Sequence, residues 1–331
     1  NALLGYSWQE NYREGFFAKG QDAQSDHIGS SNLAIFNEVN YGDIGSWAAK
    51  SNLIGYFARA QYNYNQKYYA AASIRRDGSS KFGENNKWGW FPTAAVGWNI
   101  HSENFMKNAN WLDQLKLRAS YGVSGNQEIG EYHSLVVWEP SGKAINPETG
   151  QEVITFAPAW NANPDLKWEE TTEFNIGLDF SFFKGRLSGT LEVYQKRTYD
   201  LLGEYTVPTT TNLAPRTWAN SGEMDNKGIE LFLQGFPVST SNFSWKTTFV
   251  VSHNVTTVKD LGEYFNEEDG VRKEGQISGR GMVGEEYYVI GMMNGEQIGA
   301  FYLPTYVALQ DGEFVYASNT GGFTTDLAYA E

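Results

Sequence analysis

The feature that most constrains the fold of this chain is an alternation of apolar and polar residues with a period of two, while helical periodicity is nearly absent. Successive side chains of a strand point to opposite faces, so this alternation predicts strands with one apolar and one polar face. Nine such segments precede Asn254: residues 2–9, 53–65, 67–77, 90–101, 115–121, 173–180, 187–193, 229–234 and 243–252. The chain is therefore predicted to be all-β, with antiparallel strands.

The connections between these segments alternate in length. Residues 65–67, 183–185 and 235–242 are short, residues 11–52, 122–169 and 199–225 are long, and residues 77–89 and 102–114 are intermediate. Short turns on one side and long loops on the other are typical of an up-and-down transmembrane β-barrel. The mean hydropathy is −0.48 and the sequence has no run of about 18 apolar residues, which together exclude a transmembrane helix. A barrel strand needs only about 10 residues of alternating polarity.

Aromatic and charged residues are placed as such a barrel requires. Aromatic residues make up 15% of the chain and gather near the short turns, as at Tyr64, Tyr68 and Trp98. An Arg or Lys facing lipid at the bilayer midplane costs about 2–4 kcal/mol, and no charged residue interrupts the apolar runs of the nine segments, such as the run from Tyr68 to Ile74. The opposite faces carry Arg59, Arg75, Lys116, Arg118, Glu173, Asp179, Glu192, Glu230 and Lys246. These faces are expected to line a water-filled lumen.

A soluble β-sandwich also alternates, and a secreted sandwich that binds glycans is one alternative. Its core face would be rich in Val, Ile and Leu, whereas Ala, Gly, Tyr and Trp dominate several of these faces. A passive porin of similar build is a second alternative. The net charge of −14 argues against a partner that is a nucleic acid, and the absence of cysteine excludes a disulfide framework and thiolate chemistry.

Several motifs resemble, in order, those of the SusC/RagA family of TonB-dependent outer-membrane transporters. They are SIRRDGSSKFG at 73–83, GWFPT at 89–93, GW at 97–98, LKLRASYG at 115–122, GN at 125–126, NPDLKWE at 163–169, YDLL at 199–202, NSG at 220–222 and NKGIE at 226–230. The resemblance extends from about residue 53 to residue 230, and GEQIGAFY at 295–302 is also similar to the family.

This resemblance implies a barrel of about 22 strands in the outer membrane of a Gram-negative cell, with a plug domain inside it. It further implies contact with TonB through the plug region, a SusD-like surface lipoprotein as partner, and energised import of oligosaccharides or oligopeptides. Nine strands cannot close such a barrel, so residues 1–331 are expected to be a partial barrel that lacks the plug and the closing strands. Residues 255–331 are expected to be a long loop with uncertain strands, possible at 255–261 and 281–290.

No residue set points to catalysis, a cofactor or a metal. His27, His101, His133 and His253 are far apart and lack a second ligand at metal spacing. Glu169 and Glu170 are adjacent in a strand, so their side chains point to opposite faces and cannot flank one bond. The acidic cluster at 267–269 lacks an EF-hand calcium loop and is expected to be solvated. The chain is therefore predicted not to be an enzyme.

The candidate functional residues are contact surfaces. Trp138, Trp160 and Trp218 lie in long loops, where they could stack on substrate sugars, dock a partner, or pack the loops on themselves. The expected lumen-lining residues are Arg59, Arg75, Lys116, Arg118, Glu173, Asp179 and Glu192. These charges could tune solute passage, but a lattice of solvated ion pairs on the inner wall is the favoured interpretation.

Overall fold

The computed structural model describes residues 1–23, 25, 27, 32–40, 42–264, 270–277, 287–318 and 321–325. One antiparallel sheet dominates, with the strand order β1-β4-β5-β6-β7-β10-β11-β14-β15. Its strands are β1 (Ala2–Ala18), β4 (Ile44–Tyr64), β5 (Tyr68–Ser79), β6 (Trp88–Asn99), β7 (Leu112–Asn126), β10 (Glu169–Phe182), β11 (Leu187–Tyr199), β14 (Glu223–Ser239) and β15 (Ser244–Asp260). These nine strands correspond to the nine segments expected from the alternation.

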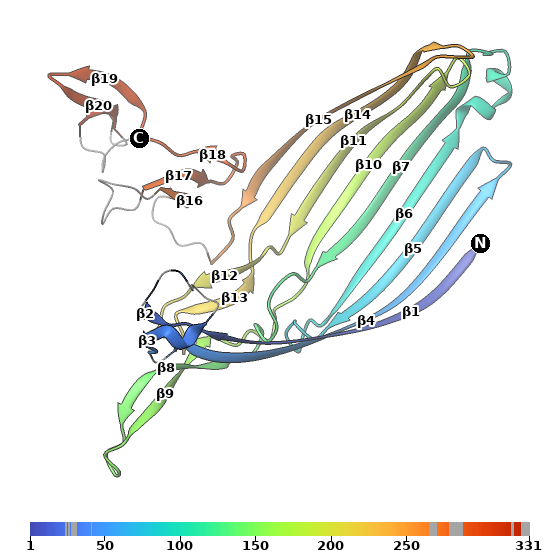
Figure 1. Ribbon diagram of the computed structural model, residues 1–331. Coiled ribbons are helices and arrows are strands. Elements are labelled where there is room, and N and C mark those ends of the chain that lie inside the picture. Colours follow the sequence, from blue (N-terminus) through green and yellow to red (C-terminus); the bar gives the residue numbers. More distant parts are fainter. Residues whose placement is uncertain are drawn as a thin grey trace.

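The other strands form small hairpins and sheets outside this wall. At the end opposite the short turns lie β2 (Gln21–Ala23) with β3 (Phe36–Glu38), β8 (Val137–Ile145) with β9 (Glu152–Trp160), and β12 (Leu202–Thr206) with β13 (Arg216–Asn220) (Figure 1). Beyond β15 lie β16 (Arg272–Ile277), β17 (Tyr287–Met292), β18 (Ala300–Phe301), β19 (Tyr306–Gln310), β20 (Glu313–Ala317) and β21 (Phe323–Thr324). Three short 3-10 helices complete the described elements: η2 (Leu33–Ile35), η3 (Ile100–Ser102) and η4 (Asn104–Met106).

The strands are strongly tilted. Tyr64, Leu117 and Leu231 lie in one hydrogen-bonded row, yet β4 ends at Tyr64 whereas β14 continues to Ser239. Relative to this row, the strand end near the short turns has shifted by about eight residues over six neighbouring strands. At about 3.3 Å per residue along a strand and about 4.8 Å between strands, this shift corresponds to a strand tilt of about 40°. A tilt of about 35–45° is the range of transmembrane barrel strands.

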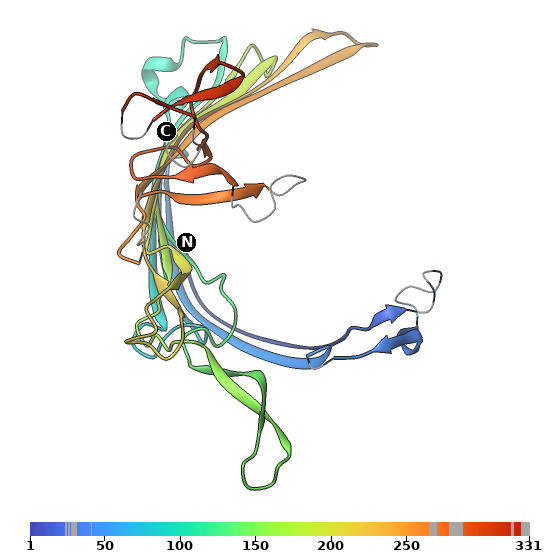
Figure 2. The ribbon, with the colours of Figure 1, turned by 90° about the vertical axis from the view of Figure 1, so that its left-hand side faces the viewer.

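The sheet has an apolar and a polar face, because directly paired residues of neighbouring strands share a face. We call the side of Tyr68, Trp98 and Leu117 the apolar face and the side of Arg59 and Arg118 the polar face. Large side chains on the apolar face remain open; Leu117 is 39% exposed. The sheet is a single curved layer, and no second sheet of the described residues packs against its apolar face (Figure 2). A β-sandwich is therefore excluded.

The first long connection is shorter than expected. Residues 11–52 were expected to form a loop, but β1 and β4 continue their pairing as far as Ala18 and Ile44. The alternation fades there because both faces of this extension carry charged residues, among them Glu10, Arg13 and Lys50. Such a pattern is typical of a ribbon that has left the bilayer, where neither face needs to be apolar.

The last part of the chain contains more strand than the alternation indicated. Residues 255–260 continue β15 rather than forming a separate element. Residues 265–269 and 278–286 lie outside the described residues, so the structure gives no account of the acidic cluster at 267–269 or of most of 281–290. Among the described residues, no helix is long and apolar enough to cross a bilayer.

Candidate functional site

The polar face collects the charged residues that the alternation singled out. Arg59 lies in one row with Glu173, and Arg118 lies in another with Glu192. The pairing register places all seven expected lumen-lining residues on this one face: Arg59, Arg75, Lys116, Arg118, Glu173, Asp179 and Glu192.

Arg118 is the centre of the largest ion-pair network on this face. Its guanidinium donates two hydrogen bonds to Asp179, from Nε to Oδ2 at 2.8 Å and from Nη2 to Oδ1 at 2.9 Å, and a third to Oε1 of Glu192 at 2.7 Å. The hydroxyl of Thr190 donates to Asp179 at 3.2 Å, and the amide of Asn175 donates to Glu192 at 3.4 Å. The network therefore ties β7, β10 and β11 together through side chains as well as through the backbone.

Gly177 makes room for this network. It lies between Arg118 and Glu192 in the same row, and a Cβ atom on it would lie 2.8 Å from the guanidinium carbon of Arg118. The missing side chain lets the guanidinium cross β10 and reach β11. The glycine here has a packing role, which the alternation alone does not reveal.

The remaining charges of the polar face have smaller sets of partners. Arg75 donates to Asp77 at 2.8 and 2.6 Å and to the Ser7 hydroxyl at 3.3 Å. Glu173 pairs with Lys196 at 3.4 Å, Lys116 Nζ lies 4.9 Å from the ring centre of Tyr69, and Arg59 lies beside the Gln61 amide. Most of these charges therefore have a partner within the wall.

Two shallow grooves follow the polar face where small side chains line it. The first has a volume of about 510 Å³ and runs over Ser73, Thr93 and Ser120 between Arg59 and Glu173. The second, of about 630 Å³, extends toward the short turns past Asn63, Lys116 and Arg118. Polar and small residues thus form the floor, and charged residues stand at the edges.

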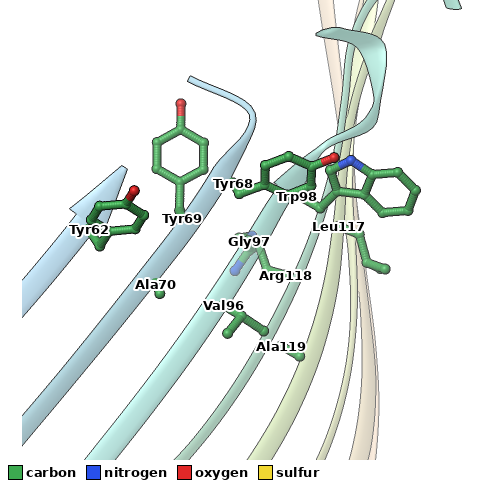
Figure 3. Close-up of a pocket in the computed structure, with 10 residues that line it drawn as sticks. All are labelled: Tyr62, Tyr68, Tyr69, Ala70, Val96, Gly97, Trp98, Leu117, Arg118 and Ala119. Atoms are coloured by element: carbon green, nitrogen blue, oxygen red, sulfur yellow. The ribbon is translucent and has the colours of Figure 1, made fainter. Parts of the chain in front are cut away.

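The apolar face also has a hollow, of about 360 Å³, close to the short turns (Figure 3). Ala70, Val96 and Ala119 lie in one row and form its floor, while the rings of Tyr68 and Trp98 stand beside it. The hollow has the shape and lining that suit a hydrocarbon chain, with amphipathic rings at the end where headgroups would lie.

The connections at the far end of the sheet fold into a hydrophobic core of their own, which we call the loop core. It consists of Phe82, Phe91, Ile129, Leu166 and Trp168. Leu166 is 0% and Phe82 1% exposed, and the Trp168 ring lies 4.9 Å from Phe82 and 5.2 Å from Phe91. Here water is excluded by protein, as in a soluble domain.

Two segments far apart in sequence meet closely in the loop core. The backbone N–H of Gly83 donates to the Leu166 carbonyl at 2.9 Å, and a Cβ atom on Gly83 would lie 2.0 Å from the Pro164 carbonyl oxygen. The Asn85 amide donates to the Asp165 carboxylate at 2.8 Å. Only glycine permits this approach, so the motifs at 73–83 and 163–169 fit together as one unit.

The Asn220 carboxamide fastens the third connection to this unit. It accepts from the Lys167 N–H at 2.8 Å and donates to the carbonyl oxygens of Lys167 and Asp200 at 2.8 and 3.0 Å. The motifs at 199–202 and 220–222 therefore also serve the packing of the loops.

The three candidate tryptophans have different surroundings. Trp138, on β8, is 59% exposed. Trp160 and Trp218 are half-buried and pack around His133, whose ring stacks on Trp218 at 4.2 Å and meets Trp160 edge-on at 4.6 Å. Burial lowers the pKa of His133, and the weaker influence of Glu204 opposes that shift.

A carboxylate in the β6–β7 turn organises the aromatic residues at the opposite end. Glu103 accepts hydrogen bonds from the Tyr68 hydroxyl at 2.5 Å, from Lys67 Nζ at 2.9 Å and from Trp98 Nε1 at 3.2 Å. These hydrogen bonds lower the pKa of Glu103 to about 2. In the described part of the chain, no three metal-ligating side chains come together.

A curved sheet of tilted strands with one apolar and one charged face is typical of a transmembrane β-barrel wall. The family model described as TonB dependent receptor-like, beta-barrel matches residues 1–328. The chain belongs to this family of outer-membrane receptors. The predicted antiparallel transmembrane β-barrel and its outer-membrane location are confirmed, with the wall left open within this chain. The family comprises receptors and transporters rather than enzymes.

Individual relatives agree with this assignment. The chain is 38% identical over 275 residues to TonB-dependent receptor P39 of Formosa agariphila, covering 83% of this chain and 25% of that protein. It is 34% identical over 217 residues to TonB-dependent receptor SusC of Bacteroides thetaiotaomicron, covering 65% of this chain and 22% of that protein. The resemblance to the SusC/RagA family is thereby confirmed.

A solved structure of the RagAB peptide transporter superposes with a TM-score of 0.75 at 24% identity, covering 98% of this chain and 34% of that chain. At this identity the likeness concerns the fold. The chain spans about a quarter of the length of the curated relatives it matches.

Proposed function

We propose that this chain forms part of the wall and outer mouth of an active outer-membrane importer of oligomeric nutrients. The observation that carries the proposal is the division of one tilted sheet into an apolar face and a face of ion pairs, in a chain that belongs to a TonB-dependent receptor family. A charged face of this kind can only border water, because facing lipid would cost about 2–4 kcal/mol per cation at the midplane.

In this proposal the polar face lines the lumen, and its charges set the shape and polarity of the path. Arg118 is held by two carboxylates, so its charge is compensated and its position fixed. Lys116 and Arg59, whose contacts are a ring and an amide, are better placed to meet a passing solute. The ion-pair lattice then supports the wall, while the uncompensated cations face the path.

The tryptophans divide between contact and support. Trp138 presents an open ring on a hairpin at the extracellular end, where it can stack on a substrate sugar or dock a partner. Trp160 and Trp218 hold the base of the same loops around His133. A contact role therefore fits Trp138 best.

The partners and substrates follow from the relatives. We infer a SusD-like surface lipoprotein over the mouth, TonB as the energy source through a plug region, and an oligosaccharide or an oligopeptide as the substrate. The similarity of the chain to SusC and the likeness of its fold to the RagAB peptide transporter support this inference. A passive porin would need neither TonB nor a proton gradient.

The test uses the full-length protein in its own cell. Deleting its gene should abolish uptake of one class of fluorescently labelled oligomer, either an oligosaccharide or an oligopeptide set, and an uncoupler should have the same effect on wild-type cells. A Trp138→Ala variant should weaken capture of that class, whereas Trp138→Tyr should preserve it. Uptake that persists in the presence of the uncoupler would identify a porin and overturn the proposal.

A further inference from the structure

The apolar face carries an arginine at the far end of β5. Arg76 pairs with Tyr56 on β4 and with Trp90 on β6, which places its side chain on the apolar face. The apolar run in residues 67–77 ends at Ile74, so Arg76 lies just beyond the alternation in this segment. The residue is exposed and lies beyond the alanines and aliphatic residues of the lipid-facing strip.

Its depth follows from two aromatic belts. Tyr64, Tyr68 and Trp98 mark the belt at the short turns, and Tyr56, Arg76 and Trp90 each lie about eight residues further along the same three strands, or about 20 Å along the membrane normal at the measured tilt. This agrees with an apolar band about 25 Å tall between two girdles. The residues between the belts are uncharged on this face: Ala58, Ala60, Tyr62, Ala70, Ala72, Ile74, Pro92, Ala94 and Val96. Arg76 therefore lies at the outer boundary of the bilayer.

Two tryptophans hold the guanidinium of Arg76. Its central carbon lies 4.8 Å from the ring centre of Trp88 and 5.0 Å from that of Trp90. The Trp88 ring lies over Gly78, where a Cβ atom would come within 2.8 Å of it, and stacks on Tyr56 at 6.1 Å. These ring contacts supply no oxygen acceptor, so the guanidinium N–H groups stay available for hydrogen bonds to one.

Arg76 also differs from three other cations on this side of the sheet, which have carboxylate partners. Lys50 pairs with Glu10 at 3.0 Å, Lys227 pairs with Asp225 at 3.4 Å, and Arg197 pairs with Glu223. Among the described residues, none forms an ion pair or a hydrogen bond with Arg76. At a lipid boundary the acceptors within reach of such a group are water and the headgroup oxygens, and a phosphate oxygen forms the stronger, charge-assisted hydrogen bond.

We propose that Arg76, between Trp88 and Trp90, binds the phosphate of an outer-leaflet lipid. The planar guanidinium suits bidentate contact with phosphate oxygens. Below it, Ala60, Ala72 and Ala94 lie in one row and leave a shallow lane for the acyl chains. This combination of one cation, a pair of rings and a small-residue lane fits a phospholipid-like molecule better than a free anion.

The test uses the full-length transporter in detergent and native mass spectrometry, with dioleoyl phosphatidic acid as the probe and dioleoylglycerol as its counterpart without phosphate. Wild type should retain the phosphatidic acid, Arg76→Gln should bind it about tenfold more weakly, and Arg76→Lys should fall between them. Dioleoylglycerol should bind weakly to all three proteins. Lys50→Gln removes a cation that already has a carboxylate partner, and should match wild type.

Two results would overturn the proposal. Equal retention of phosphatidic acid by wild type and Arg76→Gln would show that the arginine does not recognise the headgroup. Displacement of the bound lipid by millimolar inorganic phosphate would show a site for the free anion. Unchanged heat-modifiable mobility of each variant on gels confirms that the barrels compared are folded.

Discussion

Leu117 in the wall and Leu166 in the loop core are the same residue type in opposite surroundings. Leu117 stands on the apolar face of β7 and is 39% exposed, whereas Leu166 is enclosed by Phe82, Trp168 and their neighbours. The wall leaves its apolar side chains for the bilayer to cover, and its strands are tied by backbone pairing and by ion pairs such as Arg118 with Asp179. The loop core excludes water with its own side chains.

The difference shows that two regions of one chain are stabilised by different surroundings, the wall by lipid and the loop core by protein. Burying an apolar side chain in protein gains about 25 cal/mol per Å² relative to water, and lipid supplies a comparable environment to the wall without any tertiary packing. The loops extend beyond the bilayer, so they need a packed core to keep a defined shape at the mouth. Changes that remove apolar volume should therefore act strongly in the loop core and weakly in the wall.

The largest effect is expected from Leu166→Ala. Removing a fully buried leucine costs about 2–5 kcal/mol, because a cavity remains. Hydrogen exchange of the full-length protein should show faster exchange in residues 80–87 and 163–168. Leu117→Ala is the matched control and should change the exchange of β7 by less than about 1 kcal/mol, since lipid fills the space. Equal effects of the two variants would contradict the division of the molecule into two solvents.

The second largest loss of stability is expected when a charge is placed on the apolar face of a wall strand rather than on its polar face. Ile176 and Asn175 are neighbours on β10, and their side chains point to the apolar and the polar face. Ile176→Arg should lower the stability of the folded barrel in lipid vesicles by about 2–4 kcal/mol, measured from the urea midpoint. Asn175→Arg should leave it nearly unchanged, because its side chain meets water and Glu192. A similar loss in both variants would mean that the two faces do not meet different solvents.

The sequence predicted the wall better than the mouth, and the reason is physical. Alternation appears where one face meets lipid and the other water, so all nine wall strands were visible. In the extensions of β1 and β4, and in the hairpins β8–β9 and β12–β13, both faces meet water and the signal fades. The lipid-facing position of Arg76 was not predictable for a related reason, since the residue lies where the apolar strip ends.

The loop core was present in the sequence only as motifs. Gly83 and Pro164 are about eighty residues apart, and nothing in either segment indicates that they touch. The surroundings of the tryptophans were equally hidden, because a loop tryptophan can be open or packed. His133 packs against Trp160 and Trp218, although Trp138 is the tryptophan nearest to it in the sequence. The motifs typical of the family thus maintain the loop core.

The third prediction concerns acid sensitivity of the mouth alone. Burial lowers the pKa of His133, so the packed loop favours the neutral imidazole. When the loop opens, the imidazole has its ordinary pKa of 6.5. As the pH falls through 6.5, the opened state binds a proton that the packed state does not, and opening becomes more favourable. Exchange in residues 127–136, corrected for intrinsic rates, should rise between pH 7.5 and pH 5.5, by at most about tenfold for one proton taken up at the ordinary pKa.

The control for this prediction is His133→Phe, which keeps an aromatic ring between Trp160 and Trp218 but has no titrating group. Its exchange in residues 127–136 should not depend on pH after the same correction. Exchange in β7 and β10 should be insensitive to this change of pH in both proteins. A pH response that survives His133→Phe would assign the sensitivity to another group, such as Glu131 on its ion pair with Arg13.

The smallest effect is expected from the ion-pair network of the wall. Arg118 and Asp179 are partly open to water, so solvent screens their attraction and a double-mutant cycle should give a coupling of about 0.5–1 kcal/mol. The cycle consists of Arg118→Gln, Asp179→Asn and the double variant, measured by urea midpoints in lipid vesicles, and the coupling should decrease with added salt. A coupling of several kcal/mol that ignores salt would mean that this face is dry, and that the lumen along β7 is filled by protein rather than by water. A weak coupling between Arg118 and Asp179 would thus indicate that water covers the polar face. In the same way, a weak effect of Leu117→Ala would indicate that lipid covers the apolar face.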